Sequence, residues 1–506
     1  MRLAELVEEL GGGLQPSSGA DRRITGVHLD SRRVGAGDLF CALSGTQADG
    51  SSFARDAVQR GAGAILSDRM LEIPAGIPLW IHPQARRVAG LASALVLGEP
   101  SRDLFLVGIT GTNGKTTTAH LVGHLLKHVG RRPAVLGTAG NRLADGELVP
   151  ATHTTPDAPE LQRLLARHRA LGGDAAALEV SSHALDQERT AGLDFDVAVF
   201  TNLTRDHLDY HKDLETYARA KQRLFESLRP GAHAVVNADE PASERMSAAA
   251  RARNAEVVTY SARSRGDLCA TDVRTSLRGT HIVLHGMGIS RTRVWLPLAG
   301  RFNVENALAA AVCALVSGAS PSQVLEGLAA APNAPGRLEA VPTNGKGFAL
   351  FVDYAHSEDA LENVCRTLRG SLTDPNDDDS GMLTPPPRRG GRLIVVFGAG
   401  GDRDQGKRAP MGRVVNALAD LAIVTSDNPR SEDPARILSD IVSGMEPARA
   451  RRIVETDRRR AIEIACGEAR SGDVVLIAGK GHETTQTVGR EVHSFDDRAV
   501  AREVLA

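Results

Sequence analysis

The sequence is poor in aromatic residues and in cysteine. Phe, Trp and Tyr make up 3% of its 506 residues, so aliphatic side chains must build the hydrophobic cores. The cysteines are scattered along the chain and never form a CxxC pair. They are Cys41, Cys269, Cys313, Cys365 and Cys466. This pattern argues against a disulfide framework or a cysteine zinc site and favours reduced thiols in a cytoplasmic protein.

The sequence also lacks long apolar runs and an excess of charge of one sign. No run approaches the ~20 apolar residues of a membrane span, and MRLAELVEELGGG has no signal-peptide core. The 60 basic and 62 acidic residues give a net charge of −2. That balance offers no polybasic surface. We therefore expect a cytoplasmic monomer with no nucleic-acid or membrane partner.

Two polar breaks rich in Pro and Gly divide the chain into three segments. GEPSRD ends the first segment, and APNAPGRLE (331–339) begins the third. We predict an α/β protein of three domains: a small N-terminal α/β domain (1–99), a central domain (103–336) and a C-terminal domain (337–506). One stretch rich in Asp, Pro and Gly, residues 371–391, is predicted to be a flexible surface insertion.

Apolar runs that each lead into a polar or glycine-containing loop predict the sheets of the two larger domains. The central runs are 104–110, 174–182, 196–204 and 232–240. The C-terminal runs are 392–401, 421–428 and 473–481. Their alternation with helical stretches predicts mostly parallel sheets, of P-loop ATPase type in the centre and Rossmann-like at the C-terminus. Ligands bind beyond the carboxyl ends of such strands.

The stretch GITGTNGKTTTAHLVGHLL (108–126) runs from a strand through a glycine-rich turn into a helix. Backbone N–H groups in such a turn surround phosphate oxygens, Lys115 adds a positive charge, and Thr116 is placed to bind Mg²⁺. Ile109 stands where the strict P-loop pattern has Gly, so this is a variant loop. The motif predicts a nucleotide site, but a kinase, a motor and a switch protein would all fit it.

Three polar residues follow this loop along the chain. Glu179 ends an apolar run and could be a second Mg²⁺ ligand. His207 follows another strand end, and Lys221 lies on a helix. Each taken alone could be an ordinary loop or surface residue, and their joint placement after the phosphate loop is what favours a site.

At this point the sequence resembles the Mur ligases, ATP-dependent amide-forming enzymes of peptidoglycan precursor synthesis. The motifs TGTNGKTTT, EVSSHAL, TNLTRDHLDYH, FNVEN, PGRLE, DYAH, GGDRD, SDNPRSEDP and GKGHE occur in the family's order over nearly the whole chain. The resemblance is greatest to the ligases that add the third residue of the stem peptide. It implies that ATP converts a substrate carboxylate to an acyl phosphate, which an amine then attacks.

The resemblance implies roles for the residues of the central site. Lys115, Glu179, His207 and Lys221 would be catalytic. Thr116 and Glu179 would hold one Mg²⁺, and Glu179, His207 and Lys221 a second. Lys221 would be carbamylated to N6-carboxylysine, because a free ammonium would repel the metal; this requires a neutral amine, and burial lowers a lysine pKa.

The resemblance also implies two nucleotide-binding sets. The ATP set is Gly111, Thr112, Asn113, Gly114, Lys115, Thr116, Thr117, Asn303, Asn306, Arg337, Asp353 and His356. The set for UDP-N-acetylmuramoyl-L-alanyl-D-glutamate is Ser31, Thr46, Gln47, Ala48, Thr154, Thr155, Ser181, Gln187 and Arg189, which makes the N-terminal segment a UDP-binding domain.

The amine substrate of such ligases is meso-diaminopimelate or L-lysine, which differ by one distal carboxylate. Members that take diaminopimelate carry Asp-Asn-Pro-Arg in the loop that here reads SDNPRSEDP (426–434). A buried carboxylate needs a partner, and Arg430 offers a bidentate one, while Glu483 suits the distal ammonium. The implied pocket is Arg403, Asp427, Asn428, Pro429, Arg430, Gly479 and Glu483.

Other assignments share parts of this pattern. A folylpolyglutamate synthase or the ligase that adds D-Ala-D-Ala would share the phosphate loop, but we would not expect DNPR together with GKGHE. A nucleotide-driven switch protein would not need Lys115, Glu179, His207 and Lys221 together.

Overall fold

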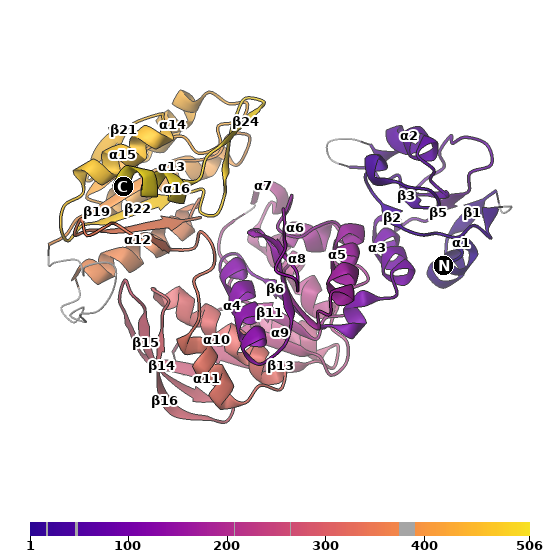
Figure 1. The fold of residues 1–506 in the computed structure, drawn as a ribbon, viewed down its shortest axis with the longest axis horizontal. Coiled ribbons are helices and arrows are strands. Elements are labelled where there is room, and N and C mark those ends of the chain that lie inside the picture. The colour runs from indigo at the N-terminus through magenta and orange to yellow at the C-terminus, as the bar shows by residue number, and fades with distance from the viewer. Residues whose placement is uncertain (17–18, 46–48, 207, 264, 374–389) are drawn as a thin grey trace.

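The computed structural model describes residues 1–16, 19–45, 49–206, 208–263, 265–373 and 390–506. Figure 1 shows three lobes, each around its own sheet, with the central lobe between the N-terminal and C-terminal ones. This confirms the predicted three-part α/β fold, while the boundaries at residues 99 and 336 stay predictions. No helix in these ranges is long and apolar enough to cross a membrane.

The N-terminal lobe holds a five-stranded sheet in the order β1-β5-β4-β3-β2, parallel except for β1. Its strands are β1 (Gly13–Gln15), β2 (Val27–His28), β3 (Leu39–Cys41), β4 (Ala64–Ser67) and β5 (Leu79–Ile81). Its helices are α1 (Leu3–Leu10), η2 (Ser31–Arg33), η3 (Gly50–Phe53), α2 (Ala54–Gln59) and α3 (Ala85–Val96), and η4 (Pro100–Asp103) leads out of it.

The central lobe holds an 11-stranded sheet in the order β16-β15-β14-β13-β12-β11-β6-β10-β7-β8-β9. Strands from β14 to β7 in that order run parallel, and antiparallel hairpins extend both edges. The strands are β6 (Phe105–Thr110), β7 (Pro133–Gly137), β8 (Gly140–Arg142), β9 (Leu148–Val149), β10 (Ala175–Glu179), β11 (Val197–Phe200), β12 (His233–Asn237), β13 (Glu256–Ser261), β14 (Leu268–Thr275), β15 (Thr280–Gly286) and β16 (Ile289–Leu296). The helices are α4 (Lys115–His128), α5 (Ala158–Ala170), α6 (Ser182–Asp186), α7 (Leu208–His211), α8 (Leu214–Glu226), α9 (Ser243–Arg251), α10 (Arg301–Val316) and α11 (Pro321–Ala329).

Helices cover both faces of the central sheet, which is why its strands read as continuous apolar runs. Along β6, Val107 packs in one core with α4 and α10, and Leu106 packs in another with α5 and α8. Successive side chains of a strand point to opposite faces, so each strand contributes to both cores. The polar residues that follow the strands are thereby left at the carboxyl edge.

The C-terminal lobe holds a six-stranded sheet in the order β17-β18-β22-β19-β20-β21, parallel except for β17. Its strands are β17 (Glu339–Val341), β18 (Ala349–Asp353), β19 (Leu393–Phe397), β20 (Leu421–Val424), β21 (Arg451–Val454) and β22 (Val474–Ala478), with a separate hairpin β23 (Thr485–Val488) and β24 (Glu491–Ser494). Its helices are α12 (Glu358–Thr373), η5 (Gln405–Lys407), α13 (Arg408–Leu418), α14 (Pro434–Ser443), α15 (Arg458–Glu468) and α16 (Asp497–Leu505). The predicted insertion falls mostly on residues 374–389, outside the described part of the chain.

Candidate functional site

The glycine-rich turn lies between β6 and α4, as predicted. Gly114 precedes the helix at φ +85°, a conformation that residues with a Cβ rarely adopt. The Lys115 ammonium folds back onto the turn and donates to the carbonyl oxygens of Gly111 (2.8 Å) and Thr112 (2.7 Å). Burial lowers the pKa of Lys115. The loop therefore holds a half-buried cation that donates to neutral carbonyls and forms no ion pair with a described carboxylate, which suits the binding of phosphate.

Other residues fix the shape of this turn. The Asn113 amide N–H donates to Asn202 Oδ1 (2.8 Å), and Thr201 Oγ1 donates to the Asn113 carbonyl (2.7 Å). Thr117 is buried in the first turn of α4. The turn is thus held from β11, the neighbouring strand, through polar contacts.

Glu179 at the end of β10 faces the start of α4. Its Oε2 accepts from Thr116 Oγ1 (2.9 Å) and from Thr138 Oγ1 (3.1 Å), and its Oε1 accepts from the Thr138 amide (2.8 Å). A hydroxyl and a carboxylate side by side are the hard oxygen donors that Mg²⁺ prefers. The two central residues of the predicted metal site are therefore together.

Lys221 lies on α8 with 1% of its surface exposed. Its ammonium stands 4.2 Å from the centre of the Tyr217 ring and makes no hydrogen bond to any described residue. Burial, assisted by the charge of Lys115, holds the pKa of Lys221 well below its usual value. Burial thus shifts Lys221 toward the uncharged amine that carbamylation requires.

His207, the remaining predicted metal ligand, lies outside the described residues. Within those residues, no three or more His, Cys, Asp and Glu side chains form a group that could hold a metal. The predicted set relies instead on a threonine hydroxyl and a modified lysine. Whether the site suits Mg²⁺ is therefore judged from Thr116 and Glu179, which lie side by side.

The predicted adenosine residues lie on both sides of the turn. Asn306 of α10 accepts from Thr118 Oγ1 (3.2 Å) and donates to Asn303 Oδ1 (3.2 Å), and both asparagines are buried. Arg337 reaches back to Thr116 Oγ1 (2.9 Å) and covers the Tyr354 ring at 4.4 Å. The segment that begins the C-terminal lobe thus contacts the predicted metal site directly.

Asp353 ends β18, and His356 follows it. The Asp353 carboxylate accepts from the amides of Leu338 (2.6 Å) and Ala355 (2.8 Å), and burial raises its pKa. The His356 ring bonds to the Tyr354 carbonyl (2.7 Å), and burial lowers the pKa of His356 to about 4. Both side chains are already engaged in shaping their own loop.

Sequence reasoning missed one contact between the lobes. Asp359 of α12 accepts from Asn113 Nδ2 (2.5 Å) in the phosphate loop and from Thr204 Oγ1 (3.1 Å). Burial raises the pKa of Asp359. Asn113 lies 246 positions away from Asp359 along the chain, so no local pattern could have indicated the contact.

The residues predicted to bind the dipeptide end lie beyond β10. Thr155 Oγ1 donates to the Glu179 carbonyl (2.8 Å) and accepts from the Ser181 amide (3.1 Å). Arg189 donates to the Thr155 carbonyl (2.9 Å) and to Gln187 Oε1 (2.9 Å). The Thr154 and Thr138 hydroxyls are hydrogen-bonded to each other (3.1 Å), which joins this group to the Glu179 site.

The residues predicted to bind UDP can be followed only in part. Ser31 is buried at the start of η2. Thr46, Gln47 and Ala48 lie outside the described residues.

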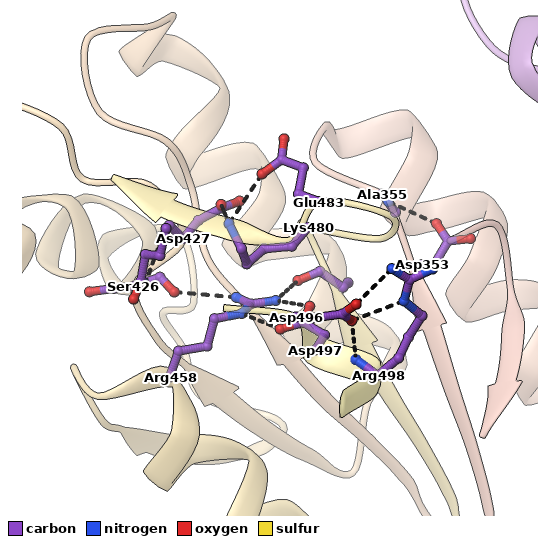
Figure 2. A network of polar contacts seen from close by, with 12 residues as sticks. Asp353, Ala355, Ser426, Asp427, Arg458, Lys480, Glu483, Asp496, Asp497 and Arg498 are labelled. Atoms are coloured by element: carbon purple, nitrogen blue, oxygen red, sulfur yellow. Dashed lines mark hydrogen bonds and ion pairs between the residues drawn. The ribbon is translucent and has the colours of Figure 1, made fainter. Parts of the chain in front are cut away.

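The predicted amino-acid pocket gathers beyond β20 and β22 (Figure 2). Asn428 Nδ2 donates to Glu483 Oε2 (2.9 Å), and Lys480, which sequence reasoning missed, donates to the same oxygen (3.1 Å). Glu483 thus already has a cationic partner, whereas it was predicted to serve the substrate ammonium. Gly479, at φ +119°, donates from its amide to the Asp353 carbonyl (3.0 Å).

Arg430 adopts a left-handed backbone conformation at φ +51°. Its amide donates to the Thr487 carbonyl (3.1 Å), and its carbonyl accepts from the Gly489 amide (2.7 Å). Its Nη1 donates to the Gly401 carbonyl (2.6 Å). The hairpin β23–β24 therefore fixes Arg430, in addition to the preceding Pro429 on which we based the prediction.

Arg403 belongs to the same Gly400–Gly401 loop. It is exposed and makes no hydrogen bond within the described part of the chain. Because the Arg430 guanidinium also lies against this loop, the two arginines stand near each other, and neither forms an ion pair with a described residue.

A cavity of about 250 Å³ lies where the β7–β9 edge meets the C-terminal lobe. Burial lowers the pKa of both His120 and His482 in its wall to about 4, so both are neutral at pH 7. It is lined by His120, Val135, Ala139, Gly140, Arg142, Leu148, Pro335, His482 and Arg498. None of these residues was predicted as a site residue.

Comparisons with known families agree over all three lobes. The chain matches the "Mur ligase family, catalytic domain" over residues 23–98, the "Mur ligase middle domain" over 109–314 and the "Mur ligase, glutamate ligase domain" over 382–481.

Comparisons with whole proteins cover nearly the full chain. It is 41% identical to a UDP-N-acetylmuramoyl-L-alanyl-D-glutamate–2,6-diaminopimelate ligase of Syntrophomonas wolfei, covering 100% of this chain and 99% of the relative. It is 42% identical to the ligase of the same name from Gloeobacter violaceus, covering 100% and 98%.

Two solved structures share the fold. A structure titled with the same ligase name superposes with a TM-score of 0.68 at 35% identity, covering 100% of this chain and 98% of that one. MurF of Acinetobacter baumannii superposes with a TM-score of 0.67 at 20% identity, covering 100% and 98%, which indicates the fold alone.

Proposed function

Because the chain belongs to the Mur ligase family, we propose that it joins meso-diaminopimelate to UDP-N-acetylmuramoyl-L-alanyl-D-glutamate. The reaction would consume ATP and form the UDP-muramoyl-tripeptide, ADP and phosphate. One observation carries the proposal: the C-terminal lobe, which holds the predicted amino-acid pocket, reaches the predicted phosphate loop through Arg337, which donates to Thr116 and covers the Tyr354 ring. Acceptor, nucleotide and amine could then meet at one place.

The reaction would proceed in two steps. An acceptor carboxylate oxygen attacks the γ-phosphorus of ATP, giving an acyl phosphate and ADP. The uncharged amine of diaminopimelate then attacks the acyl carbon, and phosphate leaves as the amide forms. An acyl phosphate is open to hydrolysis, so the lobes must exclude water while it exists.

The residues of the central lobe would bind and orient the phosphates. Backbone amides of the loop and Lys115 would hold the phosphate chain. Thr116, Glu179, His207 and Lys221 would hold Mg²⁺ at two positions, and bound Mg²⁺ would offset the repulsion between carboxylate and γ-phosphate.

Lys221 would act as N6-carboxylysine. Its neutral amine adds to the carbon of CO₂, and the proton released leaves an anionic carbamate. The buried position and lowered pKa of Lys221 support this step. The modification would replace a repelling cation by an oxygen ligand.

The C-terminal lobe would select the amine. Arg430 would pair with the distal carboxylate that diaminopimelate has and lysine lacks, with Arg403 beside it. Glu483 would receive the distal ammonium, with Asp427 and Asn428 beside it. Thr154, Thr155, Ser181, Gln187 and Arg189 would hold the dipeptide, and Ser31 with residues 46–48 the UDP end. We further propose that the three lobes act as domains with boundaries near 99 and 336, in a cytoplasmic monomer.

One assay tests the function. Phosphate release is measured with ATP alone, after adding the UDP-muramoyl-dipeptide, and after adding diaminopimelate or lysine. We expect release only with both substrates, faster with diaminopimelate than with lysine, and a product heavier by one diaminopimelate residue. Hydrolysis indifferent to both substrates would favour a switch protein, and a preference for lysine would refute the role of Arg430.

A further inference from the structure

The Lys480 side chain is fully buried between the residues of the predicted amino-acid pocket (Figure 2). Its ammonium donates to Asn428 Oδ1 (3.2 Å) and Glu483 Oε2 (3.1 Å), and lies 3.8 Å from Asp427 Oδ1. Those three partners are all residues that we assign to the substrate. Lys480 itself follows Gly479 in the GKGHE motif and has no assigned role.

These contacts immobilise the pocket in a specific way. Asn428 Oδ1 accepts from Lys480 and from the Thr487 amide (3.0 Å), so its amide nitrogen must face Glu483. Glu483 Oε2 therefore accepts from both Lys480 and Asn428, while its Oε1 makes no hydrogen bond to the described residues. One carboxylate oxygen is fixed, and the other stays available to a ligand.

The backbone beneath Lys480 is fixed as well. Arg458, buried beside the pocket, donates to the carbonyls of Ser426 (3.2 Å) and Ala478 (3.0 Å), which directly precede the pocket residues Asp427 and Gly479. The Asp497 carboxylate accepts two hydrogen bonds, of 2.8 and 2.7 Å, from the same guanidinium. The loops after β20 and β22 are thereby held at one separation.

We infer that Lys480 is a positioning residue for the incoming amino acid, an inference that rests on the proposed function. It aims Asn428 and Glu483 and offsets the charges of Asp427 and Glu483. Two carboxylates this close without a cation would repel each other and resist being charged together. With Lys480 in place, the pocket offers the free oxygen of Glu483 to the substrate ammonium. The charge of Lys480 also prevents an excess of negative charge near the two substrate carboxylates.

The test compares Lys480→Met, which keeps the length of the side chain and removes its charge, with Lys480→Arg, which keeps the charge. Lys346→Met is the matched control, because Lys346 is an exposed lysine of the same lobe. KM is measured separately for diaminopimelate, ATP and the UDP-muramoyl-dipeptide, together with kcat and the urea midpoint. Lys480→Gln, which keeps a hydrogen-bond donor without charge, is the second variant.

We expect Lys480→Met to raise KM for diaminopimelate by about tenfold or more, with KM for the other two substrates within about twofold. Lys480→Arg should recover part of the loss, and Lys346→Met should match wild type. The inference is overturned if KM for diaminopimelate is unchanged, if all three KM values rise together, or if neither neutral variant folds, since each outcome indicates a different or purely structural role. A wild-type enzyme that does not use diaminopimelate would refute the proposed function itself.

Discussion

The central site and the amino-acid pocket differ in whether their cationic side chains have carboxylate partners. In the central lobe, Lys115 donates to two carbonyl oxygens, and neither Lys115 nor Lys221 forms a hydrogen bond or an ion pair with a described carboxylate. Burial lowers the pKa of both lysines. In the C-terminal lobe, Arg458 and Lys480 are fully buried, and each has carboxylate partners.

This difference separates the two tasks of a buried charge. A cation without a carboxylate partner is costly to bury, so it persists where a ligand or a chemical modification will complete it. A cation with its partners in place fixes the surrounding backbone and does not need a ligand. The comparison therefore predicts which substitutions affect chemistry and which affect stability.

The largest expected effect is on stability and concerns the buried ion pair of Arg458 and Asp497 in the C-terminal lobe. Asp497→Ala leaves Arg458 buried without its carboxylate, so the free energy of unfolding of the C-terminal lobe should fall by about 3–5 kcal/mol. Urea unfolding measures this loss. Glu503→Ala is the control, because it removes the exposed partner of the adjacent Arg459 and should barely move the urea midpoint. Equal effects of the two variants would contradict the assigned role of the buried pair.

The next largest effect is on turnover and concerns Lys221, a lysine of the central lobe without a carboxylate partner in the described structure. Lys221→Ala should lower kcat by about a hundredfold or more, since it removes a charged group acting on the reacting phosphate, while the urea midpoint stays close to wild type. Arg219→Ala, an exposed change on the same helix, is the control. A ¹³C carbamate signal from labelled bicarbonate should appear in wild type and vanish in Lys221→Ala. Full activity of the variant would refute the role of Lys221.

The sequence was enough to predict the position of groups that follow from local order along the chain. Lys115 and Thr116 follow a glycine turn, and Glu179 ends an apolar run, so the parallel sheet brings them together. Arg458 and Asp497 are 39 positions apart, and their pairing depends on how α15 and α16 pack. No periodicity encodes that choice.

Lys480 shows a second limit. It stands in a motif that we quoted, yet a lysine is mostly exposed in proteins, and nothing in the letters GKGHE reveals that its ammonium is buried among acceptors. The prediction for Glu483 was incomplete for the same reason, since one of its oxygens already serves Lys480. Arg430 was correctly placed near a strand end, but the hairpin that fixes its backbone lies about 60 residues further along.

A smaller effect tests substrate choice. Arg430→Ala should lower kcat/KM with diaminopimelate by at least about tenfold, because a substrate carboxylate would lose its partner, with little change for lysine and for ATP. Arg436→Ala, an exposed arginine on the following helix, is the control. Equal losses with both amino acids would mean that Arg430 supports the loop and does not read the carboxylate.

The smallest effect concerns the contact of Asp359 between the central and C-terminal lobes. Asp359→Ala removes the acceptor of Asn113 and Thr204, and roughly 1 kcal/mol of hydrogen bonding corresponds to about a fivefold fall in kcat/KM for ATP. Asp359→Asn keeps an acceptor oxygen for these two neutral donors, so it should retain most of the activity. Glu362→Ala, on the same helix but paired only with exposed Arg366, should match wild type. If the Asn variant is as impaired as the Ala variant, the negative charge of Asp359 matters and the hydrogen bonds alone do not account for the link between the lobes.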